Sequence, residues 1–116
     1  MARAISVLNM KNFDLIKHLE RQKSFSLKTF GPGFRTTGVI NHITKELEEI
    51  KNDPFDLEEW IDVILLAMDG AWRTGASPEQ IAQMIEFKQT KNESRKWPDW
   101  KTLSETDPIE HVKEDS

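Results

Sequence analysis

Two pairs of carboxylates, each spaced three residues apart, most constrain what this chain can fold into. Glu46 and Glu49 form the first pair, and Glu59 and Asp62 form the second. The second pair lies at the start of residues 61–69, a segment that is apolar almost all the way round a helix. Carboxylates at such positions are expected to be buried. Buried carboxylates need a counter-charge, and a divalent metal ion is well suited to supply it.

Hydrophobic periodicity predicts an all-α fold, because no segment alternates between apolar and polar residues with a period of two. The apolar residues recur every three to four positions, which is typical of helices that pack in a bundle. Four main helices are expected, over residues 12–23, 38–52, 56–73 and 77–94. Their expected caps are Asn12 or Asp14, then Thr37, Asp56, and Ser77 in a capping box with Gln80. Residues 24–38 are dense in turn formers and are expected to form a shaped loop.

Composition bounds the class of protein. The chain has 116 residues, no cysteine and a net charge of −4, which exclude a thiolate metal site and argue against general nucleic-acid binding. We expect one all-α domain over residues 1–102 and a flexible acidic tail over residues 103–116. The longest apolar stretch, residues 63–68, is too short to span a bilayer, so we expect a cytoplasmic protein without a membrane partner. The low hydrophobic fraction of 37 % favours a homo-oligomer, in which subunit contacts supply further burial.

The two carboxylate pairs are expected to face each other. If the second and third helices form an antiparallel hairpin across Asp53 and Pro54, the pairs lie at matching levels on either side of the turn. Four converging carboxylates would repel one another unless cations lie between them, and all-oxygen ligation suits Mg²⁺ or Mn²⁺. Either pair alone would more simply be a set of solvent-facing acids. Both pairs at matched levels favour the metal site.

The last predicted helix carries a second cluster, because its apolar face becomes basic towards its end. The polar residues on that face are Lys88, Lys91, Asn92 and Arg95. The helix dipole alone favours cations near a carboxyl end. Four such donors on one face are more than the dipole requires, and they suit a polyanion such as a triphosphate.

These motifs together resemble a known family. The pattern resembles the all-α, MazG-like nucleoside triphosphate pyrophosphohydrolases, and within them the dATP/dGTP diphosphohydrolase branch common in bacteriophages. The blocks that carry the resemblance are residues 31–38, 57–62, 69–73 and 95–100, within a matching stretch from Phe30 to Trp100. The gap between the acidic pairs is shorter than in many members of the superfamily, so the turn between the helices must be tight.

The resemblance implies an enzyme that converts a purine deoxynucleoside triphosphate into its monophosphate and pyrophosphate. It assigns two or more Mg²⁺ ions to Glu46, Glu49, Glu59 and Asp62, which form the catalytic centre with Glu49 as a candidate base. It assigns the phosphate chain to the basic cluster of the last helix. It also implies a dimer or a tetramer. Candidates for contacts to the base or sugar are Arg35, His42, Trp60, Asp69 and Trp72, with Phe34 and Trp97 as further stacking partners. For each tryptophan, and for His42, a purely structural role remains an alternative.

Two other functions stay open from the sequence. The chain could be a non-catalytic helical adaptor, in which the acids form a surface for a basic partner. It could also keep the same fold and act on a pyrimidine deoxynucleotide or a nucleotide sugar. The sequence does not fix the choice between dATP and dGTP, the number of metal ions, or which carboxylate acts as the general base.

Overall fold

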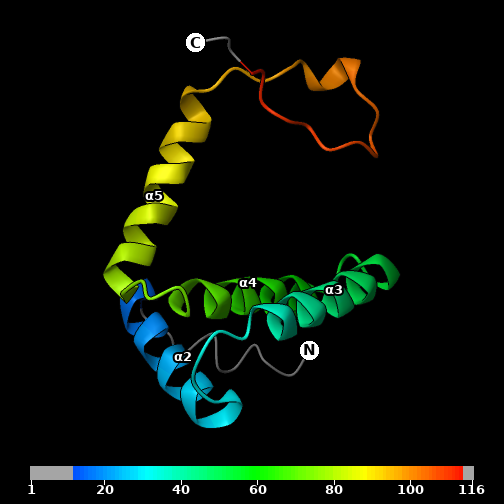
Figure 1. Cartoon of the computed structure of the whole chain (residues 1–116). Coiled ribbons are helices and arrows are strands. Elements are labelled where there is room, and N and C mark those ends of the chain that lie inside the picture. Colours follow the sequence, from blue (N-terminus) through cyan, green and yellow to red (C-terminus); the bar gives the residue numbers. More distant parts are fainter. Residues whose placement is uncertain (1–11, 114–116) are drawn as a thin grey trace. The chain divides into compact units, whose positions relative to one another are not determined.

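The computed structural model describes residues 12–113, and these form helices joined by short loops (Figure 1). Within this range there is no strand, which confirms the all-α prediction. The chain divides into two compact units, one ending at Ala82 and the other beginning at Gln83. The expected division into residues 1–102 and 103–116 stays a prediction. No helix within the described range is long and apolar enough to cross a bilayer.

Helix α2 spans Leu15–Phe30 and begins at the Asp14 cap, whose carboxylate accepts a hydrogen bond from the Lys17 amide at 3.1 Å. The predicted end of this helix near residue 23 is wrong, because the helix continues through half of the expected loop. The reason is a tertiary contact that periodicity does not reveal. Ser26 lies on the inner face of α2, where its hydroxyl donates to Asp69 of a later helix. This contact keeps the second half of α2 helical and places it beside α4.

Helices α3, Thr36–Asn52, and α4, Leu57–Trp72, pack side by side as a hairpin (Figure 1). A tight turn over residues 53–56 joins them, as the short spacing between the acidic pairs predicts. Asp56 caps α4 by accepting a hydrogen bond from the Glu58 amide at 3.0 Å. The predicted cap of α3 at Thr37 is wrong, because the helix begins at Thr36, two residues before its predicted start, and no side chain caps it.

The small core of the first unit lies where α2, α4 and the start of α5 meet. Leu19, Trp72 and Ile81 are its buried members. Helix α5, Pro78–Ser94, begins with the predicted capping box: Ser77 and Gln80 exchange side-chain and backbone hydrogen bonds of 2.8 and 3.1 Å. Both α2 and α3 contact α4, as expected for a central helix.

Not all of the apolar face of α4 is covered. Leu57, Ile61 and Ile64 lie on the side where Met68 and Trp72 continue towards the core, but they are 71, 40 and 46 % exposed. Within residues 12–113, the rest of the protein therefore covers only the carboxyl-terminal end of this apolar stripe.

The second unit contains the end of α5, the short 3₁₀ helix η1, Trp100–Thr102, and the segment that follows. The Trp97 indole donates to the Asn92 carbonyl at 2.7 Å. The Val112 amide donates to the Lys96 carbonyl at 2.8 Å, and the rings of Trp97 and His111 lie 5.9 Å apart. The chain after η1 therefore folds back onto the residues that end α5.

Candidate metal centre and adjoining cavity

Three of the four predicted metal ligands come together across the α3–α4 hairpin. Glu46 and Glu49 of α3 and Glu59 of α4 each offer one carboxylate oxygen, and these oxygens lie within 4.8 Å of one another. The hairpin produces this convergence because residues at equal distances from the turn lie at equal levels on the two helices. Both carboxylates of α3 therefore face the first carboxylate of α4.

The charges of this cluster are strongly coupled. A hydrogen bond with Glu49 raises the pKa of Glu59 to about 7, and burial and the negative charge of Glu49 act in the same direction. Hydrogen bonds with Glu59 and Glu46 lower the pKa of Glu49, although burial opposes this. Without a cation, a proton on Glu59 therefore relieves the repulsion between the carboxylates.

The cluster has the properties of a site for a hard divalent cation. Glu46 is only 8 % exposed, and its Oε2 atom is buried without a hydrogen-bond partner among residues 12–113. The Oε2 atom of Glu59 is buried and unpartnered in the same way. Buried carboxylate oxygens without donors are costly, and a cation that accepts oxygen ligands would satisfy them. The residues present thus fit Mg²⁺ or Mn²⁺.

Asp62, the fourth predicted ligand, lies one turn beyond Glu59 on α4. It is exposed and is not part of the three-carboxylate group. Together with Glu46 it lines a cavity of about 610 Å³ that begins beside the cluster. His42, one turn before Glu46 on α3, also lines this cavity, and its Nε2 atom lies 3.4 Å from Oε1 of Glu46.

The cavity is enclosed by α2, α3 and α4, and most of its lining is apolar or cationic. Phe25 and Phe30 of α2 form an edge-to-face pair with ring centroids 6.1 Å apart. Arg21 and Arg35 contribute positive charge. An apolar wall with a few charged groups, beside a cluster of carboxylates, is the usual composition of a small-molecule site.

Three of the five residues predicted to contact the base or sugar line the cavity: Arg35, His42 and Asp69. Trp60 lies elsewhere on α4, half exposed, and its indole donates to the Pro54 carbonyl at 2.9 Å. Trp72 is part of the buried core. Phe34 is 86 % exposed and borders a second, smaller groove.

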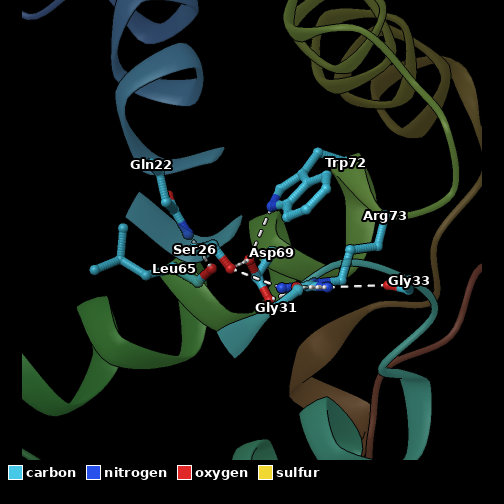
Figure 2. A network of polar contacts seen from close by, with 8 residues as sticks. All are labelled: Gln22, Ser26, Gly31, Gly33, Leu65, Asp69, Trp72 and Arg73. Carbon is cyan, nitrogen blue, oxygen red and sulfur yellow. Dashed lines mark hydrogen bonds and ion pairs between the residues drawn. The ribbon is translucent and has the colours of Figure 1, made fainter. Parts of the chain in front are cut away.

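The oxygens of Asp69 are already engaged within the protein. Its Oδ1 atom accepts hydrogen bonds from the Ser26 hydroxyl and, at 2.8 Å, from the Trp72 indole, and its Oδ2 atom accepts from Arg73 Nε at 3.0 Å (Figure 2). Burial alone would raise the pKa of Asp69. The hydrogen bonds from Ser26, Arg73 and Trp72 outweigh burial and hold the pKa below its usual value. The Asp69 carboxylate therefore lies at the edge of the cavity as an ionised structural anchor.

The predicted phosphate ligands lie on the part of α5 that belongs to the second unit. Lys88 and Lys91 are exposed, and Asn92 and Arg95 are half-buried. Arg95 Nη1 donates to Asn92 Oδ1 at 3.1 Å, and Lys91 Nζ lies 5.9 Å from the ring centroid of Phe87.

Sequence reasoning missed the contribution of α2. Arg21, Gln22 and Phe25 line the cavity from this helix. Phe25 follows Arg21 by four residues and Gln22 by three, a spacing that indicates a shared helix face. The helix was, however, expected to stop at residue 23. Ser26 and Arg73 were missed as well. The four-residue spacing of Asp69 and Arg73 could have indicated their ion pair.

The family model for the dATP/dGTP pyrophosphohydrolases matches residues 18–116. This chain belongs to the dATP/dGTP pyrophosphohydrolase family. The match confirms the resemblance to the MazG-like enzymes and places the chain among the hydrolases that act as nucleoside triphosphate diphosphatases. The matched stretch includes the hairpin, the cavity-lining residues and the basic end of α5. No curated protein and no solved structure matches the chain.

Proposed function

We propose that this member of the dATP/dGTP pyrophosphohydrolase family hydrolyses dATP and dGTP to their monophosphates and pyrophosphate, with divalent metal held by the hairpin carboxylates. The observation that carries the proposal is the group of three carboxylates beside the cavity, in a chain of this family. Two of the three have a buried oxygen without a hydrogen-bond partner among residues 12–113. A surface that only bound a basic partner would have no reason to leave carboxylate oxygens buried.

The chain's own residues divide into those that hold the metal and those that hold the nucleotide. Glu46, Glu49 and Glu59 would hold the cation, and Asp62, one turn further along α4, is our candidate ligand for a second ion. When bound there, Mg²⁺ or Mn²⁺ supplies charge neutralisation on the phosphates and a water of lowered pKa. Glu49 is our candidate for the general base among these carboxylates.

The purine would occupy the cavity against the Phe25 and Phe30 rings, with Arg35 and His42 at its border. This places the base a short distance from the carboxylates, as attack at the α-phosphorus requires. We propose the cations and the amide at the end of α5 as contacts of the phosphate chain: Lys88, Lys91, Asn92 and Arg95. That assignment rests on their common helix face and on the resemblance.

We further propose that the enzyme is a homo-oligomer. The exposed residues Leu57, Ile61 and Ile64 form a continuous stripe on α4, and Ile40 and Leu47 of α3 are exposed as well. Burying such residues in a subunit interface would stabilise the hairpin that carries the carboxylates. Light scattering of the protein as it elutes from a size-exclusion column should give a mass of at least twice the 13.5 kDa of one chain. A monomer at assay concentration would contradict this part of the proposal.

The test of the catalytic proposal compares each of the four deoxynucleoside triphosphates with Mg²⁺ and resolves the products. Wild-type protein should convert dATP and dGTP and release pyrophosphate. Glu49→Gln should lose turnover while keeping its helical circular dichroism spectrum. Glu48→Gln is the matched control, because Glu48 is next in the chain but pairs with Lys51 on the exposed side of α3. Equal loss in both variants, or orthophosphate as the product, would contradict the proposal.

A further inference from the structure

The guanidinium of Arg73, at the end of α4, ties together three separate parts of the first unit (Figure 2). Its Nε atom donates to Asp69 at 3.0 Å, and its Nη2 atom donates to the Ser26 hydroxyl of α2 at 2.9 Å. Its Nη1 atom donates to the carbonyls of Gly31 and Gly33, each at 2.9 Å. Arg73 is only 7 % exposed and does not line the cavity. The proposed chemistry makes no use of it.

The two carbonyls that Arg73 binds fix the course of the loop between α2 and α3. Gly31 and Gly33 have φ angles of 86° and 94°, in the region that favours glycine. These angles direct both carbonyls towards one guanidinium nitrogen. Because the carbonyls are fixed on either side of Pro32, the path of the chain into α3 is set by Arg73.

Arg35 follows this fixed loop by two residues and lines the cavity. Its guanidinium lies against Gly38, where an added Cβ atom would come within 3.3 Å of Nη2. Among the described residues its side chain forms no hydrogen bond or ion pair, so its donors are available to a ligand. Arginine carries five donors in a fixed fork, which bind a nucleotide well only when the guanidinium is correctly placed.

We propose that Arg73 is a positioning residue for the nucleotide: through the carbonyls of Gly31 and Gly33 it holds Arg35 at the cavity wall, where Arg35 contacts the bound substrate. The inference rests on the proposed function. It predicts that Arg73 affects substrate affinity through Arg35.

The test is a double-mutant cycle on nucleotide affinity. The variants are Arg73→Lys, Arg35→Ala and both together, titrated with α,β-imido-dGTP in the presence of Mg²⁺, and also assayed for KM and kcat with dGTP. Lysine keeps a positive charge beside Asp69, but its single nitrogen cannot reproduce the four hydrogen bonds that the three guanidinium nitrogens of Arg73 donate. Lys28→Gln is the control, because Lys28 is a cation in the last turn of α2 that does not line the cavity.

Each single variant should weaken binding by about tenfold or more, the worth of one hydrogen bond to a charged group. The double variant should bind no more weakly than Arg35→Ala alone, since both changes remove the same contact. KM should rise while kcat changes little. Purely structural damage would instead add to the effect of Arg35→Ala. Additive losses, or unchanged affinity in Arg73→Lys, overturn the inference.

If Arg73→Lys does not fold, a second variant tests the inference. Pro32→Gly loosens the loop between the two carbonyls that Arg73 binds and leaves every side chain of the buried network in place, and it should also raise KM. An unchanged KM in Pro32→Gly overturns the inference. A wild-type protein that binds the analogue and passes the cycle but turns over no dGTP contradicts the proposed function alone. A wild-type protein that neither binds nor hydrolyses contradicts both.

Discussion

Replacing Asp69 by asparagine tests how strongly the buried ion pair holds the first unit together. The side chains of Arg73 and Asp69 are only 3 and 10 % exposed, and their closest atoms lie 3.0 Å apart. Asparagine keeps the shape of the side chain and can still accept from Ser26 and Trp72. It leaves the Arg73 guanidinium buried without a counter-charge, which costs roughly 3–5 kcal/mol. That loss is a large part of the roughly 5–15 kcal/mol that stabilises a typical domain.

Urea unfolding followed by far-ultraviolet circular dichroism measures this loss. With an m-value of about 2 kcal/mol/M, a loss of about 4 kcal/mol lowers the midpoint by about 2 M. Asp53→Asn is the matched control, because Asp53 is an exposed residue of the same unit whose side chain forms no hydrogen bond or ion pair within residues 12–113. Its midpoint should change little.

The difference in stability between wild type and Asp69→Asn should depend on pH. The hydrogen bonds that outweigh burial hold the pKa of Asp69 below its ordinary value of 3.8. As the pH falls, the unfolded chain therefore binds the proton first, so the contribution of Asp69 is complete above about pH 4 and is lost as the pH falls through the folded pKa. The stability difference between wild type and Asp69→Asn should shrink in that window. A loss below about 1 kcal/mol at pH 7, within the range of an exposed pair, would refute the reasoning.

Three further changes have distinct expected results. Glu59→Gln should keep the fold but lose the thermal stabilisation by Mn²⁺. For wild type that stabilisation is about 2.7 kcal/mol at a metal concentration one hundred times Kd. An undiminished shift in melting temperature would argue against a metal at this cluster. Gly38→Ala should raise KM by displacing the Arg35 guanidinium, although alanine favours the helix by up to about 1 kcal/mol in unfolding experiments. Ser77→Ala should cost about 1 kcal/mol of stability, measured by urea unfolding, because the capping box with Gln80 is lost.

The hairpin and three of its carboxylates could be predicted from the sequence because they depend on local spacing. A short turn forces Glu46, Glu49 and Glu59 to matching levels, whatever the rest of the chain does. Asp62 lies on the same helix one turn further on, where it faces the cavity instead of the cluster. Spacing alone gives the level of Asp62 along the helix. It does not show whether its carboxylate points towards the other three.

The cavity was much less accessible to sequence reasoning, because its wall depends on long-range contacts. The second half of α2 looked like a loop, since it is followed by Gly31, Pro32 and Gly33. Its helical state depends on Ser26 meeting Asp69, forty-three residues later in the chain. Periodicity within α2 could not reveal that partner. For the same reason Phe25 and Phe30 were not recognised as the aromatic wall of the site.

Hydrolysis of dGTP in ¹⁸O-labelled water with Mg²⁺ tests the central claim most directly. If the hairpin carboxylates hold metal and deliver water to the α-phosphorus, the label should appear in dGMP, and the pyrophosphate should carry none. Mass spectrometry measures the ¹⁸O content of both products in a single experiment. Label in the pyrophosphate, or release of labelled orthophosphate, would contradict the account.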